Sequence, residues 1–108
     1  MELREGQFVT ATVSLKTSSG HPAAYQVGTE SWTSSDPAVE VVQDSADPLK
    51  AKITGIDGSS NASALVTFKC DGDPDDDESR DVVATLDVVV TQGEAMVAEI
   101  TTDTPQDV

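Results

Sequence analysis

The sequence is poor in the residue types that most catalytic and metal sites need. Its 108 residues include one cysteine and one histidine. A single cysteine excludes an internal disulfide and a multi-cysteine metal site. The histidine, His21, lies in a loop of Ser, Gly and Pro, and this loop offers no Cys or Ser arrangement in which His21 would act as a base. Because a Gly-x-Ser-x-Gly elbow and a phosphate-binding glycine loop are also absent, the sequence predicts a protein that is not an enzyme and needs no cofactor.

Basic residues are scarce as well, with 6 Lys and Arg against 20 Asp and Glu and a net charge of −14. Phosphate contacts need clustered Lys or Arg, so we expect no binding to nucleic acid, and the same charge disfavours anionic membrane surfaces. The acidic surface is interpreted as a solvated coat that keeps the protein soluble. The alternative is an acidic surface that docks onto a basic partner or holds cations.

Long apolar runs are missing. No stretch approaches the roughly 20 apolar residues of a membrane span. The N-terminal residues Met-Glu-Leu-Arg-Glu-Gly-Gln lack the apolar core of a secretory signal. We therefore expect no membrane partner and a protein that is made and folded in the cytoplasm.

Aromatic residues number four, and hydrophobic residues make up 37% of the chain. A core must then be built largely from Val, Ala, Leu and Ile, and the abundance of Val and Thr favours strands. Apolar and polar residues alternate in short segments separated by Gly, Pro, Ser and Asp, which predicts an antiparallel β-sandwich of about seven strands. The expected strand regions are 7–16, 24–33, 39–41, 49–54, 62–70, 81–91 and a short extension over 96–100.

We expect one domain over residues 1–100 and a flexible acidic tail over residues 101–108, which are polar and lack periodicity. Tyr25 and Val27 are expected to point inward, and Cys70 is interpreted as a small buried apolar residue, with a reactive thiol as the alternative. The expected core residues are Val13, Trp32, Val66, Phe68, Leu86 and Val88.

Two features are candidates for binding. In the strand region 81–91, Val83 and Val89 fall on the polar face, where they could contact a partner. The loop after Cys70 carries Asp71, Asp73, Asp75 and Asp77, and alternating carboxylates around a glycine are a Ca²⁺-binding pattern. Pro74 within the loop and the missing glutamate at the twelfth position weaken the pattern. The favoured interpretation is therefore a solvated hairpin tip without a metal, whose charge discourages aggregation.

Three segments resemble the group 2 bacterial immunoglobulin-like domains. Residues 5–13, Glu-Gly-Gln-Phe-Val-Thr-Ala-Thr-Val, are similar to the opening strand of that family. Residues 31–39, Ser-Trp-Thr-Ser-Ser-Asp-Pro-Ala-Val, resemble its Trp-x-Ser-Ser-Asp-Pro turn and are the most specific of the three. Residues 52–56 and 64–68 resemble its valine-threonine-glycine strand and the core strand that follows. The resemblance implies an all-β, immunoglobulin-like antiparallel β-sandwich.

The family is common in phage structural proteins and in bacterial surface proteins. For a chain without an export signal, the resemblance favours a virion protein, namely a phage capsid decoration protein that docks on the major capsid protein or another virion protein. Such a protein would be made in the host cytoplasm, and it could form a homo-oligomer on the particle. The alternatives are a phage tail or fibre component, and a cell-surface adhesin module that binds carbohydrate or a host protein. In either phage role, the N-terminal arm or the C-terminal tail could become ordered on docking.

Overall fold

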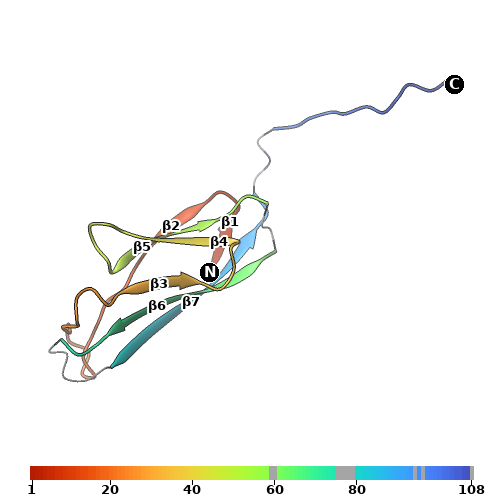
Figure 1. Cartoon of the computed structure of the whole chain (residues 1–108). Coiled ribbons are helices and arrows are strands. Elements are labelled where there is room, and N and C mark those ends of the chain that lie inside the picture. Colours follow the sequence, from red (N-terminus) through yellow and green to blue (C-terminus); the bar gives the residue numbers. More distant parts are fainter. Residues whose placement is uncertain (59–60, 75–79, 94, 96, 108) are drawn as a thin grey trace.

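The computed structural model describes residues 1–58, 61–74, 80–93, 95 and 97–107. Within these residues the chain is all-β and contains no helix, so none is present that could cross a membrane. Figure 1 shows two sheets packed face to face in an immunoglobulin-like β-sandwich. The strands in the described part of the chain are β1 (Glu2–Arg4), β2 (Phe8–Thr12), β3 (Ser31–Ser34), β4 (Val39–Gln43), β5 (Lys50–Gly55), β6 (Ser63–Asp71) and β7 (Asp81–Thr91).

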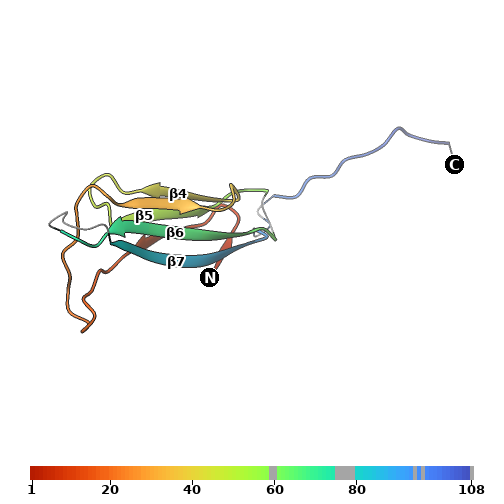
Figure 2. The same cartoon turned by 60° about the horizontal axis from the view of Figure 1, so that its bottom comes forward.

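One sheet has the order β1-β7-β6-β3 and the other the order β2-β5-β4. All strand pairings are antiparallel except that of β1, which runs parallel to the last three residues of β7. Figure 2 shows the layers from the side, with β4 and β5 above β6 and β7. The pairing of β6 with β7 is the longest and runs from Ser63 opposite Val89 to Asp71 opposite Asp81.

The core lies between the sheets. Val66, Phe68 and Val88 are buried there as expected. Trp32 and Leu86 are only partly buried and pack against the edge of the cluster, and Val13 is also partly buried, beyond the end of β2. Cys70 is buried as expected, and the other buried apolar residues, which the expected core residues did not include, are Leu3, Ala38, Val39, Ala51, Ile53, Ala64 and Val90.

The N-terminal segment differs from the expectation of an arm that becomes ordered only on docking. Residues Glu2–Arg4 already form a strand, and the Leu3 side chain is 3% exposed. The following turn is closed by Gly6, whose φ of +79° favours glycine and whose N–H donates to Gly55 O at 2.8 Å. The N-terminal ammonium donates to Asp87 O at 2.7 Å, which fixes the start of β1 against β7.

The expected strand over 24–33 is wrong in its first part, because only Ser31–Ser34 form β3. Gly28 has a φ of +94°, and its N–H donates to a Glu30 carboxylate oxygen at 2.6 Å, so a local turn replaces the strand. Val27, which was expected to point inward, is 77% exposed. Residues 97–100 of the expected C-terminal extension form no strand, and Met96 lies outside the described residues.

The turn after β3 forms as the sequence indicates. The Asp36 carboxylate accepts the N–H of Ala38 at 2.8 Å, and the Ser34 hydroxyl donates to Asp36 O at 2.9 Å. Trp32 lies at the rim of the core with its ring edge-on to Phe68, at 5.1 Å between centroids and 62° between planes. Its indole N–H donates to Pro48 O at 3.0 Å, which connects the two sheets.

Candidate docking face

The candidate docking face is the side of the β1-β7-β6-β3 sheet that points away from the second sheet; it is called the outer face below. Along β6 and the C-terminal end of β7, buried residues alternate with the residues of this face. The pattern places Val83 and Val89 together on it, as the sequence predicts, with exposed fractions of 54% and 40%. Leu65 on β6 lies on the same face and is 40% exposed. Leu65 was not among the predicted residues, although its place in an alternating strand could have identified it.

Hydroxyl side chains fill much of the outer face. Thr33, Thr67 and Thr85 occupy opposite positions on β3, β6 and β7 and form one row across the sheet. The next row pairs Leu65 with Asp87. Apolar anchors with short polar neighbours are what a protein–protein contact needs, because the hydroxyls can bond to a partner without a large loss of side-chain entropy.

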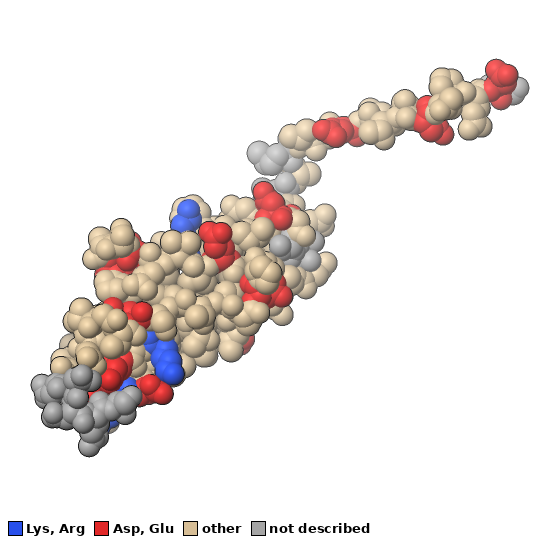
Figure 3. All heavy atoms as spheres, in the orientation of Figure 1, with Lys and Arg blue, Asp and Glu red and all other residues tan. Residues whose placement is uncertain are grey.

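The outer face carries little net charge for so acidic a chain. Its charged side chains lie mostly at the ends of the strands, where Lys69 pairs with Asp81 at 3.5 Å. Both members of this pair are more than half exposed, so the pair adds little stability. Figure 3 shows that acidic groups are spread over the visible surface and along the tail instead. The charged residues on these four described strands that point to the outer face are Glu2, Arg4, Lys69, Asp71, Asp81 and Asp87.

A recess of about 400 Å³ lies against this face and includes Leu65, Asp87 and Val89 in its lining. Ser35 forms its border, because its N–H donates to Leu65 O at 3.1 Å and its hydroxyl accepts the N–H of Leu65 at 2.8 Å. The Ser-Ser-Asp-Pro turn therefore holds the end of β3 against β6 and shapes one side of the recess. This recess offers a shallow seat for an apolar side chain of a partner.

The outward side of the β2-β5-β4 sheet also exposes apolar and charged side chains, among them Phe8, Val42 and Lys52. Phe8 is 59% exposed there, but the Lys52 ammonium lies 4.4 Å from the centroid of its ring, in a cation–π contact. Lys50 lies on β5 with Lys52, and Glu40 lies on the neighbouring strand β4. A partner on this side would have to displace the Lys52 ammonium from the Phe8 ring, whereas Leu65 and Val89 line an open recess, which favours the β1-β7-β6-β3 outer face as the docking surface.

The acidic loop is only partly within the described residues, since Asp75 and Asp77 lie outside them. The Asp71 carboxylate accepts the N–H groups of Asp73 at 2.9 Å and Arg80 at 3.1 Å. One oxygen of Asp71 thus closes the hairpin. In the part of the chain that the structure describes, no group of three or more His, Cys, Asp or Glu side chains is placed to hold a metal ion.

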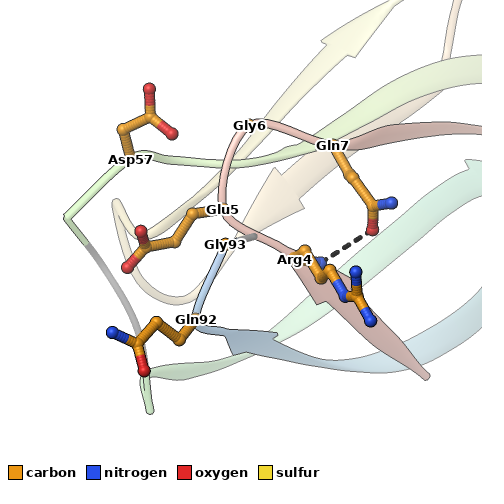
Figure 4. A pocket seen from close by; sticks show the side chains of 7 residues that line it. All are labelled: Arg4, Glu5, Gly6, Gln7, Asp57, Gln92 and Gly93. Carbon is orange, nitrogen blue, oxygen red and sulfur yellow. Dashed lines mark hydrogen bonds between the residues drawn. The ribbon is translucent and has the colours of Figure 1, made fainter. Parts of the chain in front are cut away.

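A polar recess of about 490 Å³ lies where β1, β2 and the end of β7 meet (Figure 4). Its lining includes Arg4, Glu5, Asp57 and Gln92. Figure 4 shows that the side chains of Arg4 and Glu5 point to different sides, while Gln7 accepts the N–H of Arg4 at 2.9 Å. Because the polar groups do not converge on a common point, we interpret the recess as a consequence of the shape of the β1–β2 turn and not as a binding site.

Cys70 is 2% exposed and faces the core. Burial raises the pKa of its thiol, and the nearby carboxylates of Glu30 and Asp71 raise it further. The thiolate, which is the reactive form, is therefore disfavoured. These observations support the interpretation of Cys70 as a packing residue.

Comparisons of the chain with family models, curated proteins and solved structures found no match. The assignment of the fold as a β-sandwich therefore rests on the structure alone. The resemblance to group 2 bacterial immunoglobulin-like domains remains a proposal that is supported by the three sequence segments. Any function must be argued from the surfaces described above.

Proposed function

We propose that this protein is a non-enzymatic structural protein of a phage virion, most specifically a capsid decoration protein that docks on the shell through the outer face. The observation that carries the docking proposal is the combination of exposed Leu65, Val83 and Val89 with a low net charge, on a chain whose total charge is −14. The phage setting is supported by the resemblance of residues 31–39 to the turn of a family common in phage structural proteins.

Docking through this face explains the distribution of charge. Binding energy would come from apolar anchors on the two sides of the Thr33-Thr67-Thr85 row, with Val83 on one side and Leu65 and Val89 on the other, while the hydroxyls of the row remain partly hydrated. The remaining acidic surface would keep unbound copies soluble and apart before assembly. The partner in this proposal is the major capsid protein or another virion protein.

The first test is the protein content of purified particles. Quantitative mass spectrometry should find the chain in a fixed ratio to the major capsid protein, at many copies per particle. A component of the tail or fibre would instead occur at a few copies. Absence from particles, with recovery in a bacterial surface fraction, would contradict the proposal and support the adhesin alternative.

The second test asks whether the outer face binds. Val83→Asp and Val89→Asp place a carboxylate among the apolar anchors without changing a buried position, and together they should abolish binding to particles that lack the protein. Val27→Asp is the matched control, because Val27 is 77% exposed but lies in the loop before β3. If the two outer-face variants bind as well as the control, the docking face is wrongly placed.

A further inference from the structure

The edge of β7 is only partly covered. β1 pairs with Val89, Val90 and Thr91, and no described strand pairs with the same edge of β7 from Asp81 to Asp87. An uncovered strand edge presents N–H and C=O groups that can pair with another extended chain. The direction of these groups can be deduced from the neighbouring hydrogen bonds.

The N–H of Val89 donates to Met1 O on the β1 side, whereas the N–H of Val90 donates to Ala62 O on the β6 side. Because backbone groups alternate along a strand, the N–H and C=O groups of Val83 and Thr85 point to the uncovered edge. Asp87 follows the same pattern, since its carbonyl accepts the N-terminal ammonium at 2.7 Å. The uncovered segment therefore ends where β1 begins.

An apolar groove of about 190 Å³ runs beside this segment. It opens between the sheets because β2 ends at Thr12. The burial of the inward residues of β7 therefore decreases along the strand, from Val88, which is fully buried, through Leu86, which is partly buried, to Ala84, which is exposed. The lining also includes Ala11, Val13 and Trp32. A strand added to the β7 edge would place alternate side chains in this groove.

The chain itself contains a segment with the required pattern. Residues 97–100, Val-Ala-Glu-Ile, extend from the sandwich with Val97 81% and Ile100 95% exposed (Figure 1). In an extended conformation Ala98 and Ile100 share one side and Glu99 lies on the other. Only the register that places Ala98 and Ile100 in the groove keeps the Glu99 carboxylate in water.

We propose that the C-terminal segment of one copy adds as a strand to the uncovered β7 edge of a second copy, with Ile100 in the groove. The segment cannot easily pair with β7 of its own copy, because the chain leaves β7 at the end that β1 covers. To pair with the same edge it would have to displace β1 and expose Leu3, which is 3% exposed. This self-association is separate from docking through the outer face and does not depend on it.

Two full-length variants test the proposal by sedimentation equilibrium over micromolar to millimolar concentrations. Ile100→Asp puts a charge into the groove, and Thr85→Pro removes an N–H that β6 does not use. Each should weaken self-association of the wild type by at least about tenfold. Thr85→Ala, which keeps the N–H, is the control and should associate normally. High salt should strengthen association by screening repulsion between two chains of charge −14.

Mixing the two variants gives the decisive result. Ile100→Asp keeps an intact edge and Thr85→Pro keeps an intact tail, so an equimolar mixture should recover one tail-to-edge contact and form heterodimers. In the same samples, association of the wild type should protect Trp32 from acrylamide quenching, because its ring borders the groove. A monomeric wild type at every concentration and salt would overturn the proposal. So would association that survives in both variants, or a mixture that stays monomeric.

Discussion

Replacing Trp32 tests how far the rim of the core stabilises the sandwich. The indole contributes in three ways: by its buried apolar area, by its edge-to-face contact with Phe68 and by its hydrogen bond to Pro48 O. A partly buried tryptophan covers roughly 150 Å², which corresponds to about 4 kcal/mol at 25 cal/mol per Å². A denatured chain already buries part of that area, which reduces the contribution to about 3 kcal/mol.

The ring pair adds about 1 kcal/mol and the hydrogen bond about 1 kcal/mol. The groove beside Trp32 is open, so truncation leaves no closed cavity and its neighbours can partly cover the gap. We therefore expect Trp32→Ala to lower the free energy of unfolding by about 3–4 kcal/mol. At about 4–8 °C per kcal/mol for a domain near this size, the melting temperature should fall by roughly 12–32 °C.

Urea unfolding followed by far-ultraviolet circular dichroism measures this loss without relying on tryptophan fluorescence. Trp32→Phe is the matched variant, since it keeps a ring against Phe68 but removes the indole N–H, and it should cost about 1 kcal/mol. A loss below about 1 kcal/mol for Trp32→Ala would refute the reasoning and make Trp32 a binding residue rather than a structural one.

Three further predictions concern the N-terminal strand, the Cys70 thiol and the Asp44 carboxylate. Leu3→Ala should destabilise by about 2–4 kcal/mol in urea titrations, because Leu3 is buried in the core cluster, and a loss near zero would mean that β1 is not formed in solution. Cys70 should react with a thiol reagent only after unfolding, because it is buried and its pKa is raised; fast labelling of the native protein would contradict this. The N–H groups of Ala46 and Asp47 lower the pKa of Asp44, with a smaller contribution from Lys50, so its stabilising effect is present above the unfolded pKa and is lost as the pH falls through the folded pKa. The melting temperature of Asp44→Ala should therefore lie below that of the wild type at neutral pH and approach it in acid, and a difference that stays constant with pH would exclude this linkage.

The strands that the sequence predicts well are those with a long alternating pattern. Every second residue of β6 from Ala64 to Cys70 is buried, and β7 begins and ends where the pattern does. Local chemistry was equally informative at the turn after β3, where Asp36 accepts the expected backbone N–H. Along β6 and the C-terminal end of β7 one face is buried against the second sheet, so the pattern and the fold impose the same requirement there.

The errors occur where pairing depends on residues far apart in the chain. β1 has three residues and one apolar side chain, so no periodicity marks it, and it forms only because β7 offers an edge to which it can pair in parallel. Val13 was expected in the core from its alternation with Val9 and Ala11. Its burial also depends on where β2 ends, which alternation within one strand cannot predict. The uncovered edge of β7 was missed for the same reason.

The two proposed interactions use different parts of the same strand and can therefore be separated. At Val83 and Thr85 the side chains belong to the outer face, while their backbone groups point to the uncovered edge. Val83→Asp changes a side chain but leaves its N–H in place, so it should block docking and leave self-association intact. Thr85→Pro removes an N–H, so it should block self-association and leave docking intact. The lost hydroxyl should have only a small effect on docking, which Thr85→Ala measures. A copy bound to a shell by its outer face would still have its β7 edge and its tail available for neighbouring copies. If both variants lose both interactions, the two surfaces are one, and the docking face extends around the edge of β7.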